Sequence, residues 1–338
     1  MVTIKKIAEL CGFSRGTVDR VLNARGNVKP ETEQAIRKMA EQLGYQPNPA
    51  GKALAARKHK PVVGVLLSSI GNPFFDDVIV GIKSAEESYK IYGMQVLWKS
   101  MKGYNVERQC AILDEMKNQI NALIFTPIND VRVVKKIDEF IAAGIFVVTL
   151  NNDIEGSRRN CYIGSDYENG GETACALLRL LIGDQAKIGV MMGSSKVLGH
   201  NQRMAGFEKI MKTLPGYTII AKEENEDDDI CSYEKTQQML HEHVEINAIY
   251  IVAAGVYGAC RAILNMHLQS KVHVVAFDSV PSTVEMMEKG VVKAIIYQHP
   301  YRQGKKAMQL VFEYLVNGIA PKNSQYFMQN EIKILENL

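Results

Sequence analysis

The sequence predicts a small all-α head followed by a large α/β body that is built on parallel, doubly wound sheets. The head is predicted by the first 60 residues, which hold three amphipathic segments and twelve Lys and Arg against five Asp and Glu. The body is predicted by short apolar runs, typical of buried parallel strands, that alternate with amphipathic stretches. Seven or more such units fit either one closed barrel or two separate sheets, because both give the same alternation.

Composition narrows the class of protein. The chain has 338 residues, of which 46% are hydrophobic and 23% charged, so it is neither disordered nor fibrous. Its apolar runs are far shorter than the roughly 20 residues that span a bilayer, and its charged N-terminus is unlike a secretory signal. Six scattered cysteines form no CxxC pair and favour free thiols in a reducing compartment. We therefore expect a cytoplasmic protein that does not enter a membrane.

Three helices are expected in the head. The first covers Ile4–Leu10 behind the capping hydroxyl of Thr3. Ser14 caps the second, and Pro30 begins the third, which reaches about Leu43. The side chains expected to form their common core are Ile4, Ile7, Ala8, Leu10, Val18, Val21, Leu22, Ala35, Ile36, Met39 and Leu43.

The first two helices have the pattern of a helix-turn-helix motif. Gly12 lies in the short turn between them, and the second helix exposes Arg15 and Arg20. Such a helix fits the major groove of DNA, where an arginine can form two hydrogen bonds with a guanine edge. The run Thr3–Asn23, TIKKIAELCGFSRGTVDRVLN, resembles the DNA-binding head of the LacI/GalR family of bacterial repressors.

The resemblance implies a set of DNA-binding residues. Arg15 and Arg20 would read bases, whereas Gly16 has no side chain with which to do so. Asp19 departs from the family, which usually has a serine against a phosphate there, so this head would sit slightly differently or read an unusual operator. The full implied set is Thr3, Ser14, Arg15, Gly16, Thr17, Arg20, Asn23, Leu54 and Ala55.

Residues 47–60 are expected to form a hinge helix and linker between a head of residues 1–46 and a core of residues 61–338. Gly44–Pro49 and Ala53–Ala55 also match the family. The match implies that Leu54 wedges between base pairs in the minor groove, where unstacking costs a few kcal/mol but permits bending. The alternative is a plain linker.

The body is expected to alternate strands and helices. Strands are expected at Val62–Leu67, Ala122–Phe125, Ile145–Leu150, Lys187–Met192, Ala248–Val252, Val272–Phe277 and Ala294–Tyr297. Helices are expected at Asp76–Tyr92, Asn105–Asn118, Asp130–Ala143, Asn169–Leu181, Gln202–Leu214, Tyr233–His243 and Val256–Met266.

Aromatic and polar residues follow the carboxyl ends of these strands, where open α/β sheets bind ligands. Rings suit the C–H faces of a sugar, while amide, guanidinium and carboxylate groups suit its hydroxyls. The candidate residues are Asn72, Phe74, Phe75, Thr126, Asn151, Asn152, Arg203, Asp278 and Gln298. The sequence therefore predicts a polyol site.

Residues 62–338 also resemble the periplasmic binding protein fold, and within it the ribose-binding type. The resemblance implies two lobes, an N-lobe of about 61–162 and 300–327 and a C-lobe of about 163–299 and 328–338. It implies that Phe74 and Phe75 stack on a monosaccharide or related polyol, and that the other candidates hydrogen-bond it. Asn151-Asn152 stands where the family has an Asp-Arg pair, and Ala253–Gly255 stands where it has an Asn-Asp pair. Both changes remove charge and polarity, so the ligand could be a pentose, a less hydroxylated sugar or a cyclitol.

Several of these residues also have simpler, structural interpretations. Phe74 and Phe75 could be core residues, and Arg203 could form an ion pair between the lobes without ligand. The acidic run Glu223–Asp229 is expected to be a solvated loop, and Trp98 a strand residue.

Together these features predict a LacI/GalR-type transcription regulator. It would bind a pseudo-palindromic double-stranded operator as a homodimer and, by family expectation, repress. A sugar would close the lobes about crossovers near Asn151–Cys161, Asp278–Gln298 and Gln325–Asn330. No cofactor, metal or catalytic role is expected, since the sequence has no P-loop, HExxH or GxSxG motif. The alternative, a solute-binding protein of a sugar transporter, would have no use for the head.

Overall fold

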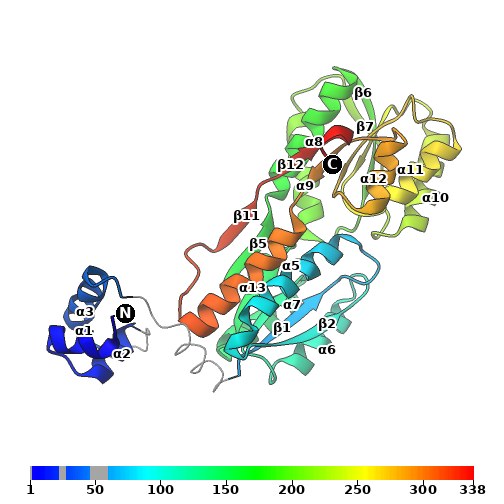
Figure 1. The fold of residues 1–338 in the computed structure, drawn as a ribbon. Coiled ribbons are helices and arrows are strands. Elements are labelled where there is room, and N and C mark those ends of the chain that lie inside the picture. The colour runs from blue at the N-terminus through cyan, green and yellow to red at the C-terminus, as the bar shows by residue number, and fades with distance from the viewer. Residues whose placement is uncertain (1, 23–27, 46–59) are drawn as a thin grey trace.

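The computed structural model describes residues 2–22, 28–45 and 60–338, which form a three-helix head and a body of two α/β lobes that lie end to end (Figure 1). Over these residues, no helix combines the length and the apolar character needed to cross a membrane.

The head closes a small core with three short helices: α1 (Ile4–Cys11), α2 (Arg15–Leu22) and α3 (Pro30–Gln42). The Thr3 hydroxyl accepts a hydrogen bond from the Lys6 amide at 3.2 Å, and Ser14 accepts one from the Thr17 amide at 3.1 Å. Both caps are as predicted. Two side chains expected in the core lie outside it, because Leu10 is 48% exposed and Ala35 is exposed, while Ala40 is buried instead.

The N-lobe is a six-stranded sheet in which every pair of neighbours is parallel, in the order β11-β5-β4-β3-β1-β2. Helices α5 and α13 pack on one face, and α6 and α7 pack on the other. The bounds are β1 (Val62–Leu67), α5 (Phe74–Tyr89), η1 (Lys90–Tyr92), β2 (Gln95–Ser100), α6 (Val106–Met116), β3 (Ala122–Phe125), α7 (Val131–Ala142), β4 (Phe146–Leu150), β5 (Cys161–Ser165), α13 (Pro300–Asn317) and β11 (Gln325–Met328).

The C-lobe repeats this arrangement, with its sheet in the order β12-β10-β9-β8-β6-β7 and only β12 antiparallel to its neighbour. Helices α8 and α9 cover one face, and α10, α11 and α12 cover the other. The bounds are α8 (Tyr167–Ile182), β6 (Ala186–Met192), α9 (Leu198–Met211), β7 (Tyr217–Glu224), α10 (Asp229–Glu242), β8 (Ala248–Ile251), α11 (Val256–Asn265), β9 (His273–Phe277), α12 (Pro281–Glu288), β10 (Val292–Tyr297), β12 (Glu331–Lys333) and η2 (Leu335–Asn337).

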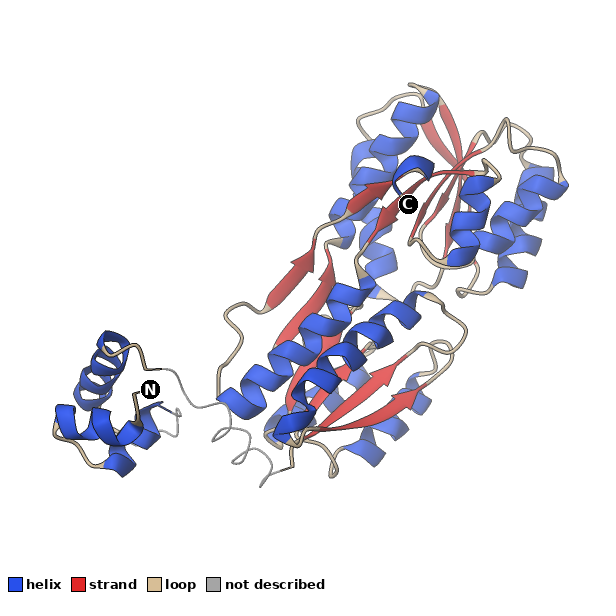
Figure 2. Ribbon diagram, viewed as in Figure 1, coloured by secondary structure: helices blue, strands red, loops and turns tan. Residues whose placement is uncertain are grey.

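The predicted fold class is confirmed, and the barrel that the alternation also allowed is not formed. Figure 2 shows two separate sheets, each between layers of helices. Each strand that the sequence predicted coincides with an observed strand to within two residues. Trp98 lies in a strand, β2, as expected.

The lobe limits differ from the expected ones because β5 stays in the N-lobe sheet as far as Ser165. The chain crosses between the lobes after β5, after β10, and between β11 and β12. The expected crossover at Asn151–Cys161 instead joins β4 and β5 of one sheet, and most of Asp278–Gln298 lies inside the C-lobe.

Candidate ligand cleft and DNA-binding surface

A cleft that is partly open to solvent lies between the lobes at the carboxyl ends of both sheets. It is lined by Asn72, Phe74, Asn151 and Asn152 from the N-lobe, and by Tyr167, His200, Arg203, Asp227, Ala253, Ala254, Asp278 and Gln298 from the C-lobe. Seven of the nine residues expected at a polyol site are therefore brought together. An adjoining compartment shares Asn72, Phe74, Asp227 and Asp278 and extends past Asp229.

Two expected residues lie elsewhere. Phe75 is 3% exposed and packs in the N-lobe core. Thr126 is also 3% exposed, and its carbonyl accepts a hydrogen bond from Gln109 Nε2 at 3.0 Å. Neither side chain is among those that line the cleft.

Arg203 projects from α9 and is held entirely by groups of its own lobe. Its guanidinium carbon lies 3.5 Å from the ring centroid of Phe277 and 4.7 Å from that of Tyr167. Its Nη1 donates to the Val252 carbonyl at 2.6 Å, and its buried Nε has no partner. Among the residues described, the structure thus shows no ion pair from Arg203 to the other lobe, and the guanidinium keeps further N–H groups besides the one bonded to Val252.

Asp278 and Gln298 form a pair at the ends of β9 and β10. Gln298 Nε2 donates to the two carboxylate oxygens of Asp278 at 2.7 and 3.0 Å. Burial raises the pKa of Asp278 to about 6, and Arg203 and the Gln298 hydrogen bond oppose that rise. Gln298 Oε1 is buried and has no partner.

Three residues that line the cleft have a backbone conformation that non-glycine residues rarely adopt. The φ angles are 64° at Asn151, 61° at Asp227 and 68° at Asp278. The carbonyl of Asn151 accepts from the hydroxyls of Tyr162 at 2.7 Å and Tyr167 at 2.6 Å, which helps to hold this turn. Strained residues of this kind are concentrated at functional sites in proteins.

Asp227 is the main cleft residue that sequence reasoning missed, because it lies in the acidic run that was expected to be a solvated loop. That prediction is wrong in part: Glu223 and Glu224 belong to β7, and Asp227 lines the cleft. One carboxylate oxygen accepts from the Ala254 amide at 3.1 Å, and the other accepts from the hydroxyl of Tyr104. His200 and Tyr167 were missed as well.

The lobes touch at the mouth of the cleft. Tyr104 belongs to the N-lobe and Asp227 to the C-lobe, so their hydrogen bond joins the two. A second link runs from the Asn129 amide to the Lys196 carbonyl at 3.1 Å. The structure is therefore a closed one.

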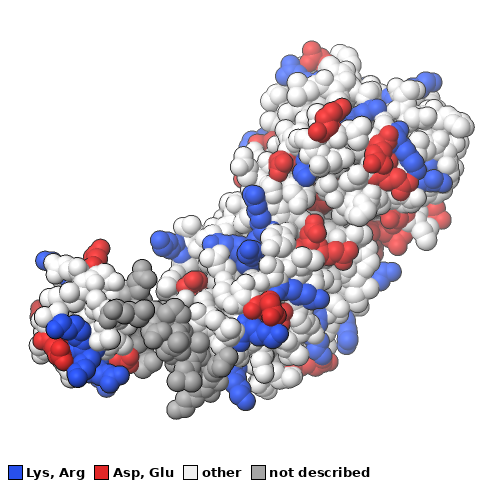
Figure 3. All heavy atoms as spheres, in the orientation of Figure 1, with Lys and Arg blue, Asp and Glu red and all other residues white. Residues whose placement is uncertain are grey.

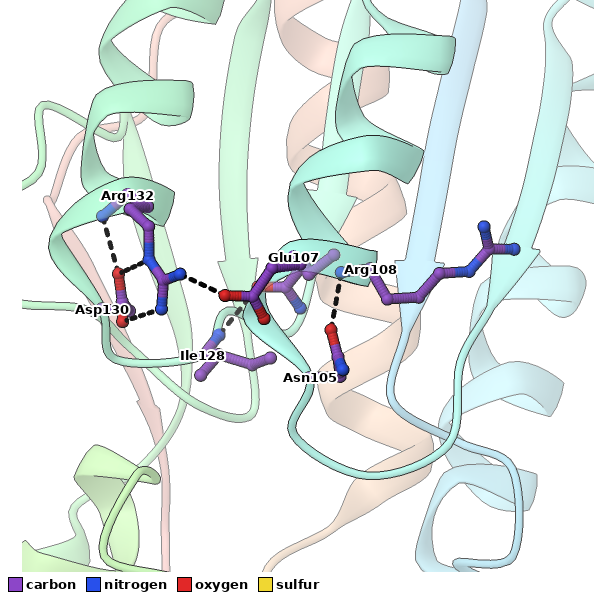
Figure 4. Close-up of polar contacts among 7 residues, drawn as sticks. Asn105, Glu107, Arg108, Ile128, Asp130 and Arg132 are labelled. Carbon is purple, nitrogen blue, oxygen red and sulfur yellow. Dashed lines mark hydrogen bonds and ion pairs between the residues drawn. The ribbon is translucent and has the colours of Figure 1, made fainter.

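A polar network stiffens the N-lobe side of this mouth (Figure 4). Asp130 caps α7 and accepts from Arg132 Nε at 2.8 Å, and Arg132 also pairs with Glu107 of α6. Gln109 Oε1 accepts from the Ile128 amide at 2.9 Å. The first turns of α6 and α7 are thus tied together beside Asn129, and Arg132 holds the pKa of Asp130 at about 2.

The head presents its expected contact surface to solvent. On α2, Val18 and Val21 are buried whereas Arg15, Gly16 and Arg20 are exposed. Figure 3 shows basic side chains gathered on the visible face of the head. Thr3, Ser14 and Thr17 lie at the starts of the first two helices, where Ser14 Oγ is 2.9 Å from Thr17 Oγ1. Asn23, Leu54 and Ala55 are outside the described residues.

No grouping of three His, Cys, Asp or Glu side chains suited to a metal ion occurs in residues 2–22, 28–45 and 60–338.

Comparisons with known proteins divide the chain into the same two parts, a DNA-binding head and a two-lobed body. Residues 3–48 match the family model described as bacterial regulatory proteins, lacI family, and residues 63–319 match the periplasmic binding protein domain. The chain is 26% identical over 325 residues to catabolite control protein A of Priestia megaterium, covering 93% of this chain and 92% of that protein. It is 24% identical over 336 residues to the ribose operon repressor of Lactococcus lactis, covering 93% and 91%.

Solved structures share the fold of the body. A glucose-galactose binding protein from Geobacillus stearothermophilus superposes with a TM-score of 0.76 at 24% identity, covering 82% of this chain and 99% of that one. A solute binding protein from Burkholderia graminis in complex with D-arabinose gives 0.77 at 21% identity, covering 82% and 96%. With its helix-turn-helix head and its two-lobed periplasmic binding protein body, the chain belongs to the lacI family of bacterial regulatory proteins, which control transcription by binding DNA.

Proposed function

We propose that the chain is a cytoplasmic repressor that binds a pseudo-palindromic operator as a homodimer, and that a monosaccharide or related polyol in the cleft sets its operator affinity. The observation that carries this proposal is the cleft itself, in which Asn72, Phe74, Asn151 and Asn152 of one lobe face Arg203, Asp278 and Gln298 of the other. The name of the Lactococcus lactis relative, a ribose operon repressor, supports a sugar effector. No catalytic step or cofactor is part of the proposal.

The mechanism follows from the position of the cleft. A ligand that contacts both lobes binds the closed arrangement more tightly than an open one and so shifts the population toward closure. The first strand of the N-lobe begins directly after residues 47–60, so lobe movement reaches the head through that segment. Because linkage is reciprocal, DNA binding must change sugar affinity by the same factor.

Asp278→Ala tests the effector site. The variant is expected to bind operator DNA as the unchanged chain does but to lose the response to sugar, because a paired carboxylate of the cleft is removed. The measurement is operator binding by fluorescence anisotropy with and without a panel of pentoses, hexoses, deoxy sugars and cyclitols. Glu288→Ala, at an exposed carboxylate of the same lobe, is the control. A sugar response that survives Asp278→Ala would place the effector elsewhere.

Arg20→Ala tests the DNA-binding surface. Loss of an exposed arginine on α2 is expected to lower operator affinity by about 1–3 kcal/mol while salt-dependent binding to random DNA is largely kept. Lys38→Ala on α3 is the matched control, since it removes one positive charge away from α2. Operator preference that is unchanged in Arg20→Ala would contradict the base-reading role.

A further inference from the structure

The cleft carries more negative than positive charge. The carboxylates of Asp227, Asp229 and Asp278 line it together with the adjoining compartment, and Arg203 supplies a single guanidinium among these lining residues. Burial lowers the pKa of His200, so its ring is neutral at pH 7. An anionic ligand such as a sugar phosphate or a uronate would meet net repulsion here.

The guanidinium of Arg203 makes its close contacts within the C-lobe. Its guanidinium lies over the Phe277 and Tyr167 rings and donates to the Val252 carbonyl. The hydrogen bonds that the two carboxylates accept come from uncharged donors: Gln298 for Asp278, and the Ala254 amide and Tyr104 for Asp227. Among the described residues, neither carboxylate accepts a hydrogen bond from a charged group, although the charge of Arg203 also lowers the pKa of Asp278.

A buried acceptor in the same place has no donor. Gln298 is 2% exposed, and its Oε1 has no hydrogen-bond partner. The amide cannot be turned over to correct this, because its Nε2 is needed to donate to Asp278. An unpaired buried acceptor costs free energy, so a donor from a ligand is expected at this position.

A group that only donates hydrogen bonds and carries a positive charge satisfies all three features. A sugar hydroxyl both donates and accepts, whereas an ammonium donates three hydrogen bonds and accepts none. We propose that the effector carries a protonated amino group, as in an amino sugar or an amino cyclitol, held among Asp227, Asp278 and the Gln298 carbonyl oxygen. This inference rests on the proposed function and specifies the ligand class of the same cleft.

The test is isothermal titration of the full-length chain at pH 7 with matched ligands. Glucosamine, galactosamine, mannosamine and an amino cyclitol are each compared with the neutral parent and with the N-acetyl derivative, which keeps the nitrogen but not the charge. At least one amine is expected to bind about tenfold or more tightly than its two partners, as a charge-assisted hydrogen bond provides.

The other outcomes separate the two proposals. Tighter binding of a neutral parent would overturn the inference and leave the sugar-responsive function standing. If glucuronate bound more tightly than the amines, the inference would also be overturned, because the cleft would then favour a negative charge over a positive one. If neither amines nor neutral compounds bind, both the inference and the sugar-responsive function fail.

The variant Asp227→Asn tests whether the Asp227 carboxylate recognises the positive charge of the ligand. The amide keeps the shape of the carboxylate and can still accept from Ala254, so the expected change is a loss of the preference for the amine over its neutral parent. Asp184→Asn, at a carboxylate of the same lobe that is 76% exposed, should keep that preference. An undiminished preference in Asp227→Asn would overturn the assigned role of Asp227.

Discussion

Asp278 combines two roles that oppose each other. Its carboxylate faces the cleft and accepts from Gln298, yet burial makes the ionised form costly and raises its pKa to about 6. Its φ of 68° adds a strained backbone at the same residue. The folded protein without ligand is therefore less stable than it would be with an uncharged side chain at this position.

Asp278→Asn should therefore stabilise the chain in a pH-dependent way. The folded carboxyl binds its proton more tightly than the unfolded one, so the unchanged chain loses stability as the pH rises from about 4 to above 6, and the amide does not. The free energy of unfolding gained by Asp278→Asn should be near zero at pH 4 and reach at most about 3 kcal/mol above pH 7, because the pKa of the folded carboxyl is about 6. Urea unfolding at four pH values measures it. If the variant were less stable than the unchanged chain at pH 7, the ionised Asp278 carboxylate would not be destabilising.

Site residues were predictable where they follow a continuous apolar run. Asn151 and Asp278 come directly after such runs, so their place at a strand end could be inferred from the sequence. Phe74 and Phe75 could not both face the cleft, because consecutive helical residues point about 100° apart. Asp227 follows β7, whose polar residues hide the strand that positions it.

Pairs of helices in each lobe approach closely enough to require glycine. A Cβ on Gly81 of α5 would lie 2.1 Å from the Tyr301 carbonyl oxygen of α13, and these helices lie side by side in Figure 1. In the C-lobe, a Cβ on Gly171 of α8 would lie 1.9 Å from the Arg203 carbonyl oxygen of α9. The second contact bears on the cleft, because it fixes the backbone that carries the Arg203 side chain.

Gly171→Ala is expected to force α8 and α9 apart. The free energy of unfolding should fall by about 1–3 kcal/mol or more, because backbone cannot yield to the added methyl as a flexible side chain can. Sugar affinity should fall with it as Arg203 moves. Leu180→Ala, on the same helix at a residue that is 83% exposed, should change stability by less than about 0.5 kcal/mol. Thermal and urea unfolding of both variants would show the contrast, and equal stabilities would refute the close approach.

The strands that the sequence did not reveal are mostly edge strands, the exception being β5. Strands β2, β7, β11 and β12 each have a neighbour on one side only and contain exposed residues, so they lack the continuous apolar run of a central strand. Central strands such as β1 and β3 were predicted with their observed bounds, because burial on both faces leaves an unbroken apolar signal.

At the scale of the molecule, hydrogen bonds between the lobes support closure, one of them inside the cleft, from the Tyr167 hydroxyl to the Asn151 carbonyl, and two at its mouth. The Tyr104–Asp227 hydrogen bond and the Asn129–Lys196 backbone link join the lobes there. A hydrogen bond to a carboxylate is worth about 1.5–3 kcal/mol, which is enough to shift an open–closed equilibrium by tenfold or more.

Tyr104→Phe should therefore open the free protein. Small-angle X-ray scattering without ligand is expected to give a larger radius of gyration for the variant, and a saturating ligand should restore the closed value. Tyr233→Phe is the matched control, since it loses a hydrogen bond to Asn265 within the C-lobe. If both variants scatter as the unchanged chain does, the contact does not govern closure.

The three crossings of the chain also set the order in which the protein can be completed during synthesis. The N-lobe sheet gains β11 only after the ribosome has made β6 to β10 of the C-lobe, and the C-lobe gains β12 later still. Until then β5 and β10 present unpaired edges, which in a nascent chain invite pairing with other chains. Neither sheet is complete without a strand from the last part of the chain, so the two lobes should mature as one unit.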